Sequence, residues 1–488
     1  MMQQPHHHHP QFLSQVRQPT IRRLLAIAGV FVSGCAILFL FSRSGSANPP
    51  PRPNLHRPLS ASAANYTCYV DLDLLRSHGY NGSVEYSRLE IAVAPTANFT
   101  GFSDALDLKF PKSAPLALSA DDEAARAPLP DEKCATTLTI PGPPARPPPD
   151  ASHMTFGVST SLERLHDSLD AFAHWAAGTN TRIIALTDEG ASFTDKVRKK
   201  AERLGVRLTL IEADDERLDR YFTLIQILYE QREEGVTQWA VLIDDDTFFP
   251  SMRNLVDRFA TYDASQPLYV GGVTEDPHQL YMGSFMAYGG AGIFLSMPLL
   301  RQIYAEFDEC YDFKGAGDRM IARCIQAHTT TKLTWDRDLH QLDLRDDASG
   351  FYESGRPLPL SVHHWKSWHA ANMVGLGRVA RICGDDCLLR RWRLADGWYL
   401  INGYSVVQYS EGTDEDTLVG MEHTWLDSKY DGWDPFGYSL GPVRKKDEGK
   451  VSYRLVDAVE VGDQVRQIYV HEPGEEPPRV LEIVWKGV

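Results

Sequence analysis

Clustered positive charge is scarce in this sequence. Its 65 Asp and Glu outnumber its 49 Lys and Arg, which gives a formal net charge of -16, and no long basic run occurs outside the N-terminus. Because phosphate backbones are bound by clustered Lys and Arg, this distribution disfavours nucleic acid as the main partner. No fixed-period repeat is visible. With 488 residues, 43% of them hydrophobic, the chain is long enough for one large core or two modest ones.

One uninterrupted apolar segment, LLAIAGVFVSGCAILFLF, covers residues 24–41 and carries no charge. Its length is close to the roughly 20 residues that a helix needs to cross a bilayer. Arg17, Arg22 and Arg23 precede it, so the positive-inside rule places residues 1–23 in the cytosol. We expect a single-pass type II protein of the Golgi or ER membrane, with everything after the anchor in the lumen. A cleaved signal peptide is the alternative, but its apolar region usually spans only about 7–15 residues.

Cysteines and glycosylation patterns agree with a lumenal location. Of the seven cysteines, Cys35 lies in the apolar segment and the other six follow it, an even number in a compartment that permits disulfides. Spacing does not fix the connectivity; the pairs we expect are Cys68–Cys134, Cys310–Cys324 and Cys383–Cys387. Asn-X-Ser/Thr patterns, which are candidate N-glycosylation sites, occur at Asn65, Asn81 and Asn98.

Proline-rich stretches divide the chain. One follows the anchor, from residue 42 to about residue 60, and a second, PGPPARPPPD, covers residues 141–150. Such compositions bury no core and form extended spacers. We expect a Pro-rich stem and a small glycosylated collar over residues 42–150. A catalytic domain would then cover residues 151–392, and a β-rich module residues 393–488.

The catalytic region alternates short apolar runs with helical spacing of apolar residues. Strands are predicted at residues 154–160, 182–188, 206–213 and 239–244, with helical segments between them. This alternation predicts an α/β fold with a mainly parallel sheet flanked by helices. Ligands of such sheets bind beyond the carboxyl ends of the strands. The polar residues that fall there are Ser159, Thr160, Asp188, Asp244, Asp245 and Asp246.

Three consecutive carboxylates, Asp244, Asp245 and Asp246, end the last of these strands. Clustered like charges repel each other unless a cation or solvent neutralises them. Mn²⁺ or Mg²⁺ is the natural partner of such oxygens, and a divalent ion can stabilise a diphosphate as it leaves. A solvated acidic turn is the alternative explanation.

Further candidates lie downstream, and each has a structural alternative. Gly289 and Gly290, in YGGAG, permit close approach of the backbone to a ligand or simply form a tight turn. Asp318 opens a segment with helical spacing and is either a general base or a plain helix-terminal carboxylate. His363 and His364 supply imidazoles, which suit Mn²⁺ and zinc alike.

The order of these motifs resembles glycosyltransferase family 31, and in particular the Fringe-like β1,3-glycosyltransferases with their uncharacterised fungal and plant relatives. The resemblance covers about residues 150–410, through VST, LTD, WAVLIDDDTFF, YGGAGIFLS, GDRMIARCI, LPLSVHHW and WYLINGYSVVQY in this order. It implies the GT-A nucleotide-sugar transferase fold, a UDP-sugar donor, Mn²⁺ and inversion at the anomeric carbon.

The resemblance also implies a role for each candidate residue. Asp246 matches the metal-binding aspartate, with His364 or His363 as the metal-ligand histidine, and Asp318 matches the catalytic base. The residues expected on the nucleotide-sugar side are Ser159, Thr160, Asp188, Asp244, Asp245, Gly289 and Gly290. The expected function is transfer of a sugar to a hydroxyl of a glycan or glycoprotein, with a β1,3 linkage. The alternative is a catalytically silent lumenal relative that acts as a lectin-like or scaffolding protein.

Overall fold

The computed structural model describes residues 68–487 except for 97–102, 107, 119–123, 130–136, 144–145, 189–190, 214–216, 284, 411–417, 419, 427–436 and 475. The predicted cytosolic tail, membrane anchor and Pro-rich stem lie outside the described residues, as do Asn65, Asn98 and Cys134. Asn81 lies within them and is exposed. In the described part of the chain, no helix is long and apolar enough to cross a membrane.

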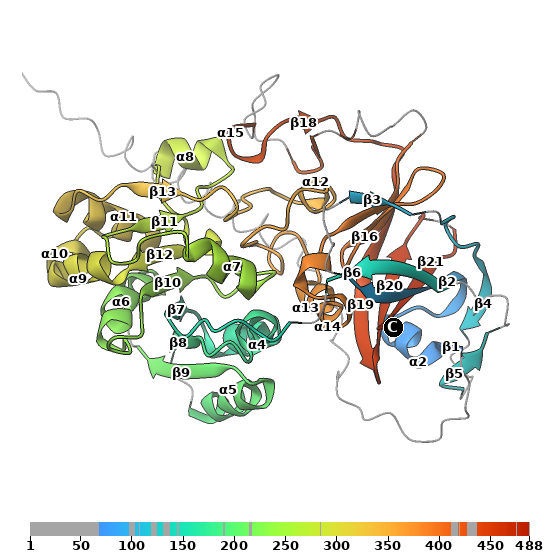
Figure 1. Ribbon diagram of the computed structural model, residues 1–488, viewed down its shortest axis with the longest axis horizontal. Helices are drawn as coiled ribbons and strands as arrows, with labels where there is room; N and C mark the ends of the chain where they lie inside the picture. Colours follow the sequence, from blue (N-terminus) through green and yellow to red (C-terminus); the bar gives the residue numbers. More distant parts are fainter. Residues whose placement is uncertain are drawn as a thin grey trace, which may run out of the picture. The chain divides into compact units, whose positions relative to one another are not determined.

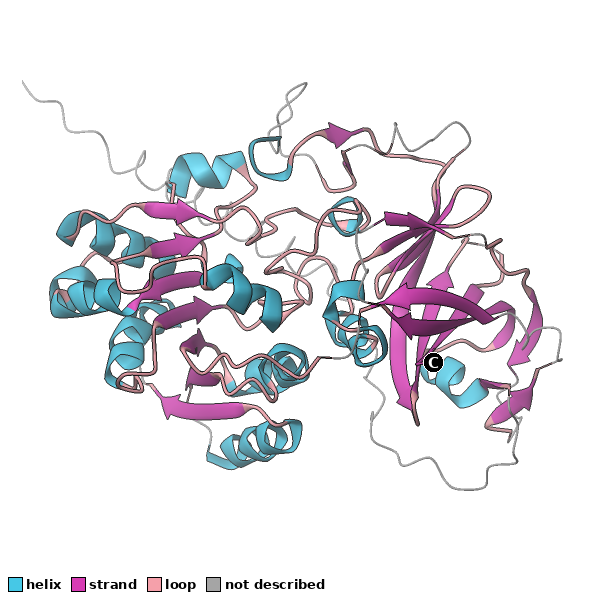
Figure 2. Cartoon of the chain, viewed as in Figure 1, coloured by secondary structure: helices cyan, strands magenta, loops and turns pink. Residues whose placement is uncertain are grey.

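A seven-stranded mixed sheet forms the centre of the region that follows the second Pro-rich stretch (Figures 1 and 2). Its strands are β7 (Met154–Ser159), β8 (Arg182–Thr187), β9 (Arg207–Glu212), β10 (Trp239–Ile243), β11 (Tyr269–Gly271), β12 (Ile293–Ser296) and β13 (Leu333–Trp335). The order is β13-β11-β12-β10-β7-β8-β9, and only β12 runs antiparallel to its neighbours. The mainly parallel sheet predicted from the sequence is confirmed.

Helices cover both faces of this sheet. Helices α4 (Leu162–Ala176) and α5 (Ala191–Leu204) pack on one face, and α6 (Arg217–Glu230), α9 (Met297–Ala305) and α11 (Gly317–His328) pack on the other. Successive side chains of β10 therefore enter different cores: Val241 belongs to the first and Leu242 to the second. Side chains of a strand alternate between faces, so burial on both faces explains why β10 is apolar throughout.

A ten-stranded sheet forms the β-rich part of the chain. Its strands are β2 (Gly82–Pro95), β3 (Ser103–Ala105), β4 (Ala114–Leu118), β6 (Thr137–Gly142), β14 (Arg391–Arg393), β15 (Trp398–Ile401), β16 (Ser405–Gln408), β19 (Val451–Val461), β20 (Gln464–His471) and β21 (Arg479–Gly487). Strand β2 pairs in parallel with β21 over nine residue pairs, from Glu85↔Arg479 to Val93↔Gly487.

The expected division into a collar and a separate C-terminal module therefore differs from the structure. Strands β2, β4 and β6, from the segment expected to be the collar, share one sheet with the strands of the C-terminal segment. The physical reason is that β21 offers one edge to β20 and its other edge to β2. Strand β14 (Arg391–Arg393) also crosses the boundary expected after residue 392.

Two of the expected disulfides lie within the described residues. Cys310–Cys324 links α10 (Phe307–Tyr311) to α11 (Gly317–His328). Cys383–Cys387 closes a short loop after α14 (Ala380–Cys383). Cys68 is also disulfide-bonded, and Cys134, its expected partner, lies outside the described residues.

A buried ion-pair cluster ties β2 to the C-terminal strands. The Glu482 side chain is 1% exposed and accepts hydrogen bonds from Arg466 Nε at 2.5 Å and from Arg88 Nη1 at 2.9 Å. The Tyr86 hydroxyl also donates to it. Burial alone raises the pKa of this carboxyl, but the charges of Arg466 and Arg88 outweigh that effect and lower it. The cluster depends on the negative charge that Glu482 supplies.

We predict that Glu482→Gln lowers the free energy of unfolding by about 3–5 kcal/mol, because it leaves the buried Arg466 guanidinium without its counter-charge and removes one of the two carboxylates paired with Arg88. Urea denaturation of the variant and the parent measures this difference. Glu476→Gln is the control, since that side chain is 64% exposed in its pair with Arg479, and exposed pairs contribute less than about 1 kcal/mol. Equal losses in the two variants would contradict the assignment.

Candidate active site

The acidic triplet begins where β10 ends. The chain leaves the sheet after Ile243, and the turn is closed by Thr247, whose backbone N–H donates to the Asp244 carbonyl at 3.1 Å. The Thr247 hydroxyl donates to the Gly290 carbonyl at 3.0 Å. This turn therefore links the triplet by a hydrogen bond to the loop that contains Gly289 and Gly290. The three carboxylates enter different surroundings, because the Asp244 side chain is 40% exposed whereas those of Asp245 and Asp246 are buried.

Asp246 lies against His363. Strand-like bonds between Phe248 and Val362, at 2.8 and 2.9 Å, bring the histidine segment beside the end of β10. His363 Nε2 lies 3.0 Å from Asp246 Oδ1 and 3.4 Å from Asp244 Oδ2. Its Nδ1 lies 3.0 Å from the Gln341 carbonyl, to which it donates. That bond leaves Nε2 facing the two carboxylates, an arrangement typical of a metal-ligating histidine.

The short distance between Asp246 and His363 shifts the pKa of both side chains. Burial raises the pKa of Asp246, but the hydrogen bond and charge of His363 outweigh this effect and hold it below its usual range. Burial lowers the pKa of His363, whereas its bonds to Asp244 and Asp246 raise it well above its ordinary value. The two carboxylates therefore place strong negative potential at His363 Nε2. A cation in this position would replace the imidazole proton.

The second histidine is turned toward another carboxylate. His364 Nε2 lies 3.1 Å from Asp343 Oδ1, and its ring stacks on Trp368 with centroids 3.8 Å apart. Its backbone has a φ of 57°, a left-handed conformation that residues other than glycine rarely adopt. This conformation directs the two adjacent histidines to different partners. A donor atom of His364 nevertheless lies within 4.8 Å of donor atoms of Asp246 and His363.

These donors fit a divalent cation. At metal–ligand distances of about 2.0–2.2 Å, neighbouring donor atoms lie about 3 Å apart. The separation of 3.0 Å between His363 Nε2 and Asp246 Oδ1 is close to that value, and Asp246, His363 and His364 each offer a donor atom within 4.8 Å of the others. Carboxylate oxygens together with imidazole suit Mn²⁺, whereas Mg²⁺ prefers oxygen ligands alone. Within the described residues, the donor set therefore fits the Mn²⁺ expected from the sequence.

Asp245 is engaged by two cationic side chains. Arg164, in the first turn of α4, donates from Nε at 2.6 Å and from Nη2 at 2.5 Å, a bidentate pair. Lys366 Nζ lies 3.4 Å from Asp245 Oδ1, and the Thr160 hydroxyl donates to Oδ2. These bonds hold Asp245 in place beside two positive charges. Sequence reasoning missed Arg164, a single charged residue on an amphipathic helix, and Lys366, which directly follows the LPLSVHHW motif.

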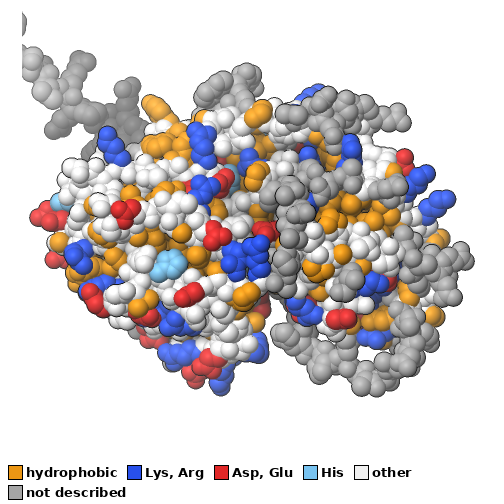
Figure 3. Space-filling view, viewed as in Figure 1, with side chains coloured by type: hydrophobic (Ala, Val, Ile, Leu, Met, Phe, Trp, Pro, Cys, Tyr) orange, Lys and Arg blue, Asp and Glu red, His pale blue; other side chains and the backbone are white. Residues whose placement is uncertain are grey.

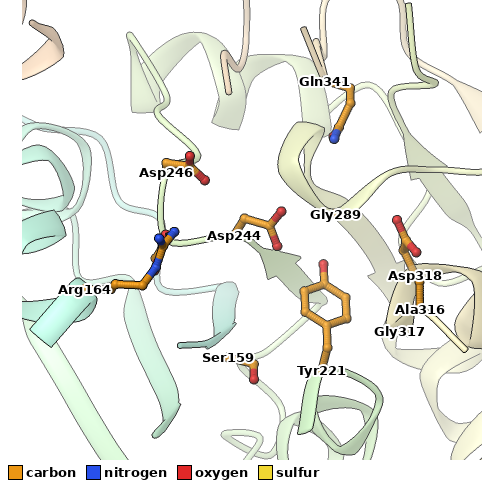
Figure 4. A pocket seen from close by; sticks show the side chains of 11 residues that line it. Ser159, Arg164, Tyr221, Asp244, Asp246, Gly289, Ala316, Gly317, Asp318 and Gln341 are labelled. Atoms are coloured by element: carbon orange, nitrogen blue, oxygen red, sulfur yellow. The ribbon is translucent and has the colours of Figure 1, made fainter. Parts of the chain in front are cut away.

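Asp318 lies across a pocket from the triplet (Figure 4). It is in the first turn of α11 and is half-buried. Burial raises its pKa to about 6, the Asp244 carboxylate adds to the rise, and the N–H groups of Arg319 and Gly289 oppose it. A carboxylate with such a pKa is ionised at neutral pH and is still basic enough to accept a proton.

The pocket has a volume of about 300 Å³. It is lined by Ser159, Arg164, Tyr221, Asp244, Asp245, Asp246, Gly289, Ala316, Gly317, Asp318 and Gln341. Arg164, the triplet and Asp318 thus face one space, to which β7, the turn after β10, α4, α6 and α11 each contribute (Figure 4). Of the polar residues expected beyond the strand ends, Ser159 and the triplet line this pocket, whereas Thr160 and Asp188 do not.

Other predicted residues take supporting positions. Asp188 is exposed and accepts the backbone N–H of Leu162 at 3.0 Å, so it caps α4. Thr160 is buried against Asp245. A Cβ added to Gly290 would lie 2.2 Å from His363 Nδ1, so this glycine makes room for the imidazole. Contact of these three residues with a nucleotide remains a prediction.

We predict that His363→Ala abolishes tight Mn²⁺ binding, because His363 Nε2 is the nitrogen that faces both Asp244 and Asp246. His364→Ala should weaken binding much less, since its Nε2 faces Asp343. Isothermal titration of Mn²⁺ into each folded variant measures the two affinities, with circular dichroism as the check on folding. A greater loss in His364→Ala would reverse the assignment of the ligand histidine.

Comparisons with known proteins complete the description of the site. A family described as "Protein of unknown function, DUF604" matches residues 278–372, which include Asp318 and both histidines. No curated protein matches the chain significantly.

Several solved structures are similar to part of the chain. Glycosyltransferase GlyE of Streptococcus pneumoniae TIGR4 is 11% identical with a TM-score of 0.29, over 44% of this chain and 56% of that chain. Mannosyltransferase PcManGT of Pyrobaculum calidifontis, solved with GDP-Man and Mn²⁺, is 17% identical with a TM-score of 0.27, over 40% of this chain and 58% of that chain. A 4-diphosphocytidyl-2C-methyl-D-erythritol synthase of Anaerococcus prevotii DSM 20548 is 10% identical with a TM-score of 0.27, over 37% of this chain and 86% of that chain. The chain thus spans little more than half the length of the first two, and scores this low assign no activity to it.

Proposed function

We propose that this protein is a metal-dependent, inverting glycosyltransferase with a GT-A fold, which moves a sugar from a UDP-sugar to an acceptor hydroxyl. One observation carries the proposal: a single pocket brings together the Asp244–Asp246 triplet, which is backed by the buried His363, and, on the opposite side, a half-buried carboxylate with a raised pKa, Asp318. Such a pocket fits a nucleotide diphosphate at the triplet and an acceptor hydroxyl at Asp318.

The residues of the pocket divide the chemistry between them. Asp246 and His363, with Asp244 close by, would hold Mn²⁺, which supplies positive charge to a diphosphate leaving group when it is bound. Arg164 keeps its guanidinium at the same side of the pocket, where it adds a fixed positive charge. The bidentate bond to Asp245 holds that charge in place before the substrate arrives. The triplet side of the pocket therefore suits the diphosphate.

Asp318 accepts the proton of the acceptor hydroxyl. The acceptor oxygen attacks the anomeric carbon and forms the new glycosidic bond, the bond from that carbon to the diphosphate oxygen breaks, and the nucleoside diphosphate leaves with the electron pair. Attack from the side opposite the leaving group inverts the anomeric centre. The β1,3 linkage follows from the family resemblance alone.

The location is part of the proposal. A type II anchor at residues 24–41 would place the catalytic region in the lumen of the Golgi or ER, where glycan and glycoprotein acceptors occur. The disulfides Cys310–Cys324 and Cys383–Cys387 support an oxidising compartment.

A donor screen tests the function. We expect the full-length protein in detergent to add one sugar to an arrayed glycan when it receives Mn²⁺ and a UDP-sugar, with the mass gain read by mass spectrometry. EDTA and Asp246→Ala should each abolish transfer, while Asp257→Ala, a change on an exposed helix surface, serves as the control. Full activity in EDTA would remove the metal from the mechanism. Failure of the protein to bind UDP in the presence of Mn²⁺ would overturn the proposed donor.

The assignment of Asp318 as the base has its own test. Asp318→Asn keeps the size and the capping ability of the side chain but removes its proton acceptor, so turnover should fall by about 10²–10⁴-fold. The affinity for UDP should stay unchanged, because the nucleotide lies at the other side of the pocket. Asp312→Asn, an exposed change shortly before α11, is the matched control. Near-normal turnover of Asp318→Asn would leave this carboxylate as a helix-terminal residue and assign the proton acceptor to another group.

The pH dependence follows from the same group. Because the pKa of Asp318 is about 6 and only the ionised carboxylate accepts a proton, kcat/KM should rise with pH through about 6 and then level off. Initial rates between pH 5 and pH 8 at saturating Mn²⁺ measure this profile. The residual activity of Asp318→Asn should lack the rise, and an identical rise in the variant would assign it to another group.

A further inference from the structure

Tyr221 lies between the two sides of the pocket. It belongs to the N-terminal half of α6 (Arg217–Glu230), and its ring stands between Asp244 and Asp318 with the hydroxyl directed toward the pocket (Figure 4). The hydroxyl oxygen is buried, and among the described residues it has no hydrogen-bond partner. A buried polar group without a partner costs free energy, and native structures tolerate few of them without a functional reason.

Two separate glycines make room for this side chain. A Cβ added to Gly289 would lie 2.3 Å from the Tyr221 hydroxyl oxygen, and a Cβ added to Gly317 would lie 2.6 Å from Tyr221 Cβ. Such distances are far shorter than van der Waals contact. The glycine loop before β12 and the loop before α11 are thus both shaped around one tyrosine. Simple core packing does not require its hydroxyl, because a phenyl ring would fill the same space between the glycines.

The charges around the pocket are unevenly distributed. Among the described residues that line it, Arg164 is the only Lys or Arg, and it lies at Asp245, whereas Tyr221 lies between Asp244 and Asp318. Burial raises the pKa of Tyr221, and the carboxylates of Asp244 and Asp318 add to the rise. The hydroxyl therefore keeps its proton and is a hydrogen-bond donor. Its surroundings favour a neutral group over an anion.

We propose that the Tyr221 hydroxyl donates a hydrogen bond to a hydroxyl of the transferred sugar and thereby positions a neutral sugar between the diphosphate and Asp318. The inference rests on the proposed function. A sugar with its own carboxylate, such as a uronic acid, would bring a third negative charge beside Asp244 and Asp318. The pocket therefore selects neutral donor sugars, with Tyr221 as the donor to their hydroxyl groups.

Stability separates this role from a structural one. Tyr221→Phe removes only the unpartnered oxygen, so its thermal unfolding midpoint should equal or exceed that of the parent protein. A structural hydroxyl would instead lower the midpoint when it is removed. Tyr229→Phe is the matched control on the same helix, because Tyr229 stacks on Tyr304 and does not line the pocket. A midpoint that falls in Tyr221→Phe alone overturns the inference.

Binding measurements test the contact itself. UDP, UDP-glucose and UDP-glucuronic acid are titrated into the full-length protein with Mn²⁺, and the gain in affinity over UDP isolates the sugar. We expect the parent protein to gain affinity from glucose and none from glucuronic acid. Tyr221→Phe should bind UDP with the same affinity as the parent protein. Its gain in affinity from glucose should be about tenfold smaller than that of the parent. Tyr229→Phe should behave as the parent does.

The outcomes separate the two levels of the proposal. No UDP binding by the parent protein overturns the proposed function, and this inference with it. If UDP binds and Tyr221→Phe keeps the full gain from glucose, the proposed function stands and the role of Tyr221 is overturned. Equal gains from glucose and glucuronic acid overturn the preference for a neutral sugar.

Discussion

Repulsion among three adjacent carboxylates is the constraint around which the pocket is built. Asp244, Asp245 and Asp246 follow β10 directly, and two of these side chains are buried. Different side chains of opposite charge meet the two buried carboxylates. Asp245 is neutralised by Arg164 and Lys366, and Asp246 lies against His363. Asp244 shares His363 with Asp246 at 3.4 Å, but its side chain is 40% exposed, so this carboxylate stays open to a ligand.

This division of charge explains why distant segments converge. Arg164 comes from the helix after β7, His363 from a segment pinned to Phe248 by backbone bonds, and Gln341 holds the imidazole from its far side. Removal of His363 would leave the buried Asp246 without its charged partner, which costs more than the pair itself contributes. The site is therefore rigid on the side of the triplet, as a site for a charged leaving group should be.

Much of the fold was predictable, and part of the site was not. Apolar runs at 154–160 and 239–244 predicted strands because burial on both faces leaves a continuous apolar signal. Arg164 and Tyr221 were not predicted, since a single polar residue on an amphipathic helix does not show which way it faces. The pairing of β2 with β21 joins segments far apart in the chain, and no local pattern encodes such a contact.

For Gly289 and Gly290, the sequence pointed to the right loop, but the expected reason for the glycines was incomplete. Gly289 and Gly290 were expected to let the backbone approach a ligand, yet their missing Cβ atoms leave space for Tyr221 and His363. The benefit to a ligand is then indirect, because small residues in the loop allow larger functional side chains to reach the pocket. Substitution of Gly290 would displace the imidazole, and substitution of Gly289 would displace the phenol. The glycines of this loop are thus best explained by the two side chains, Tyr221 and His363, that occupy the space a Cβ would take.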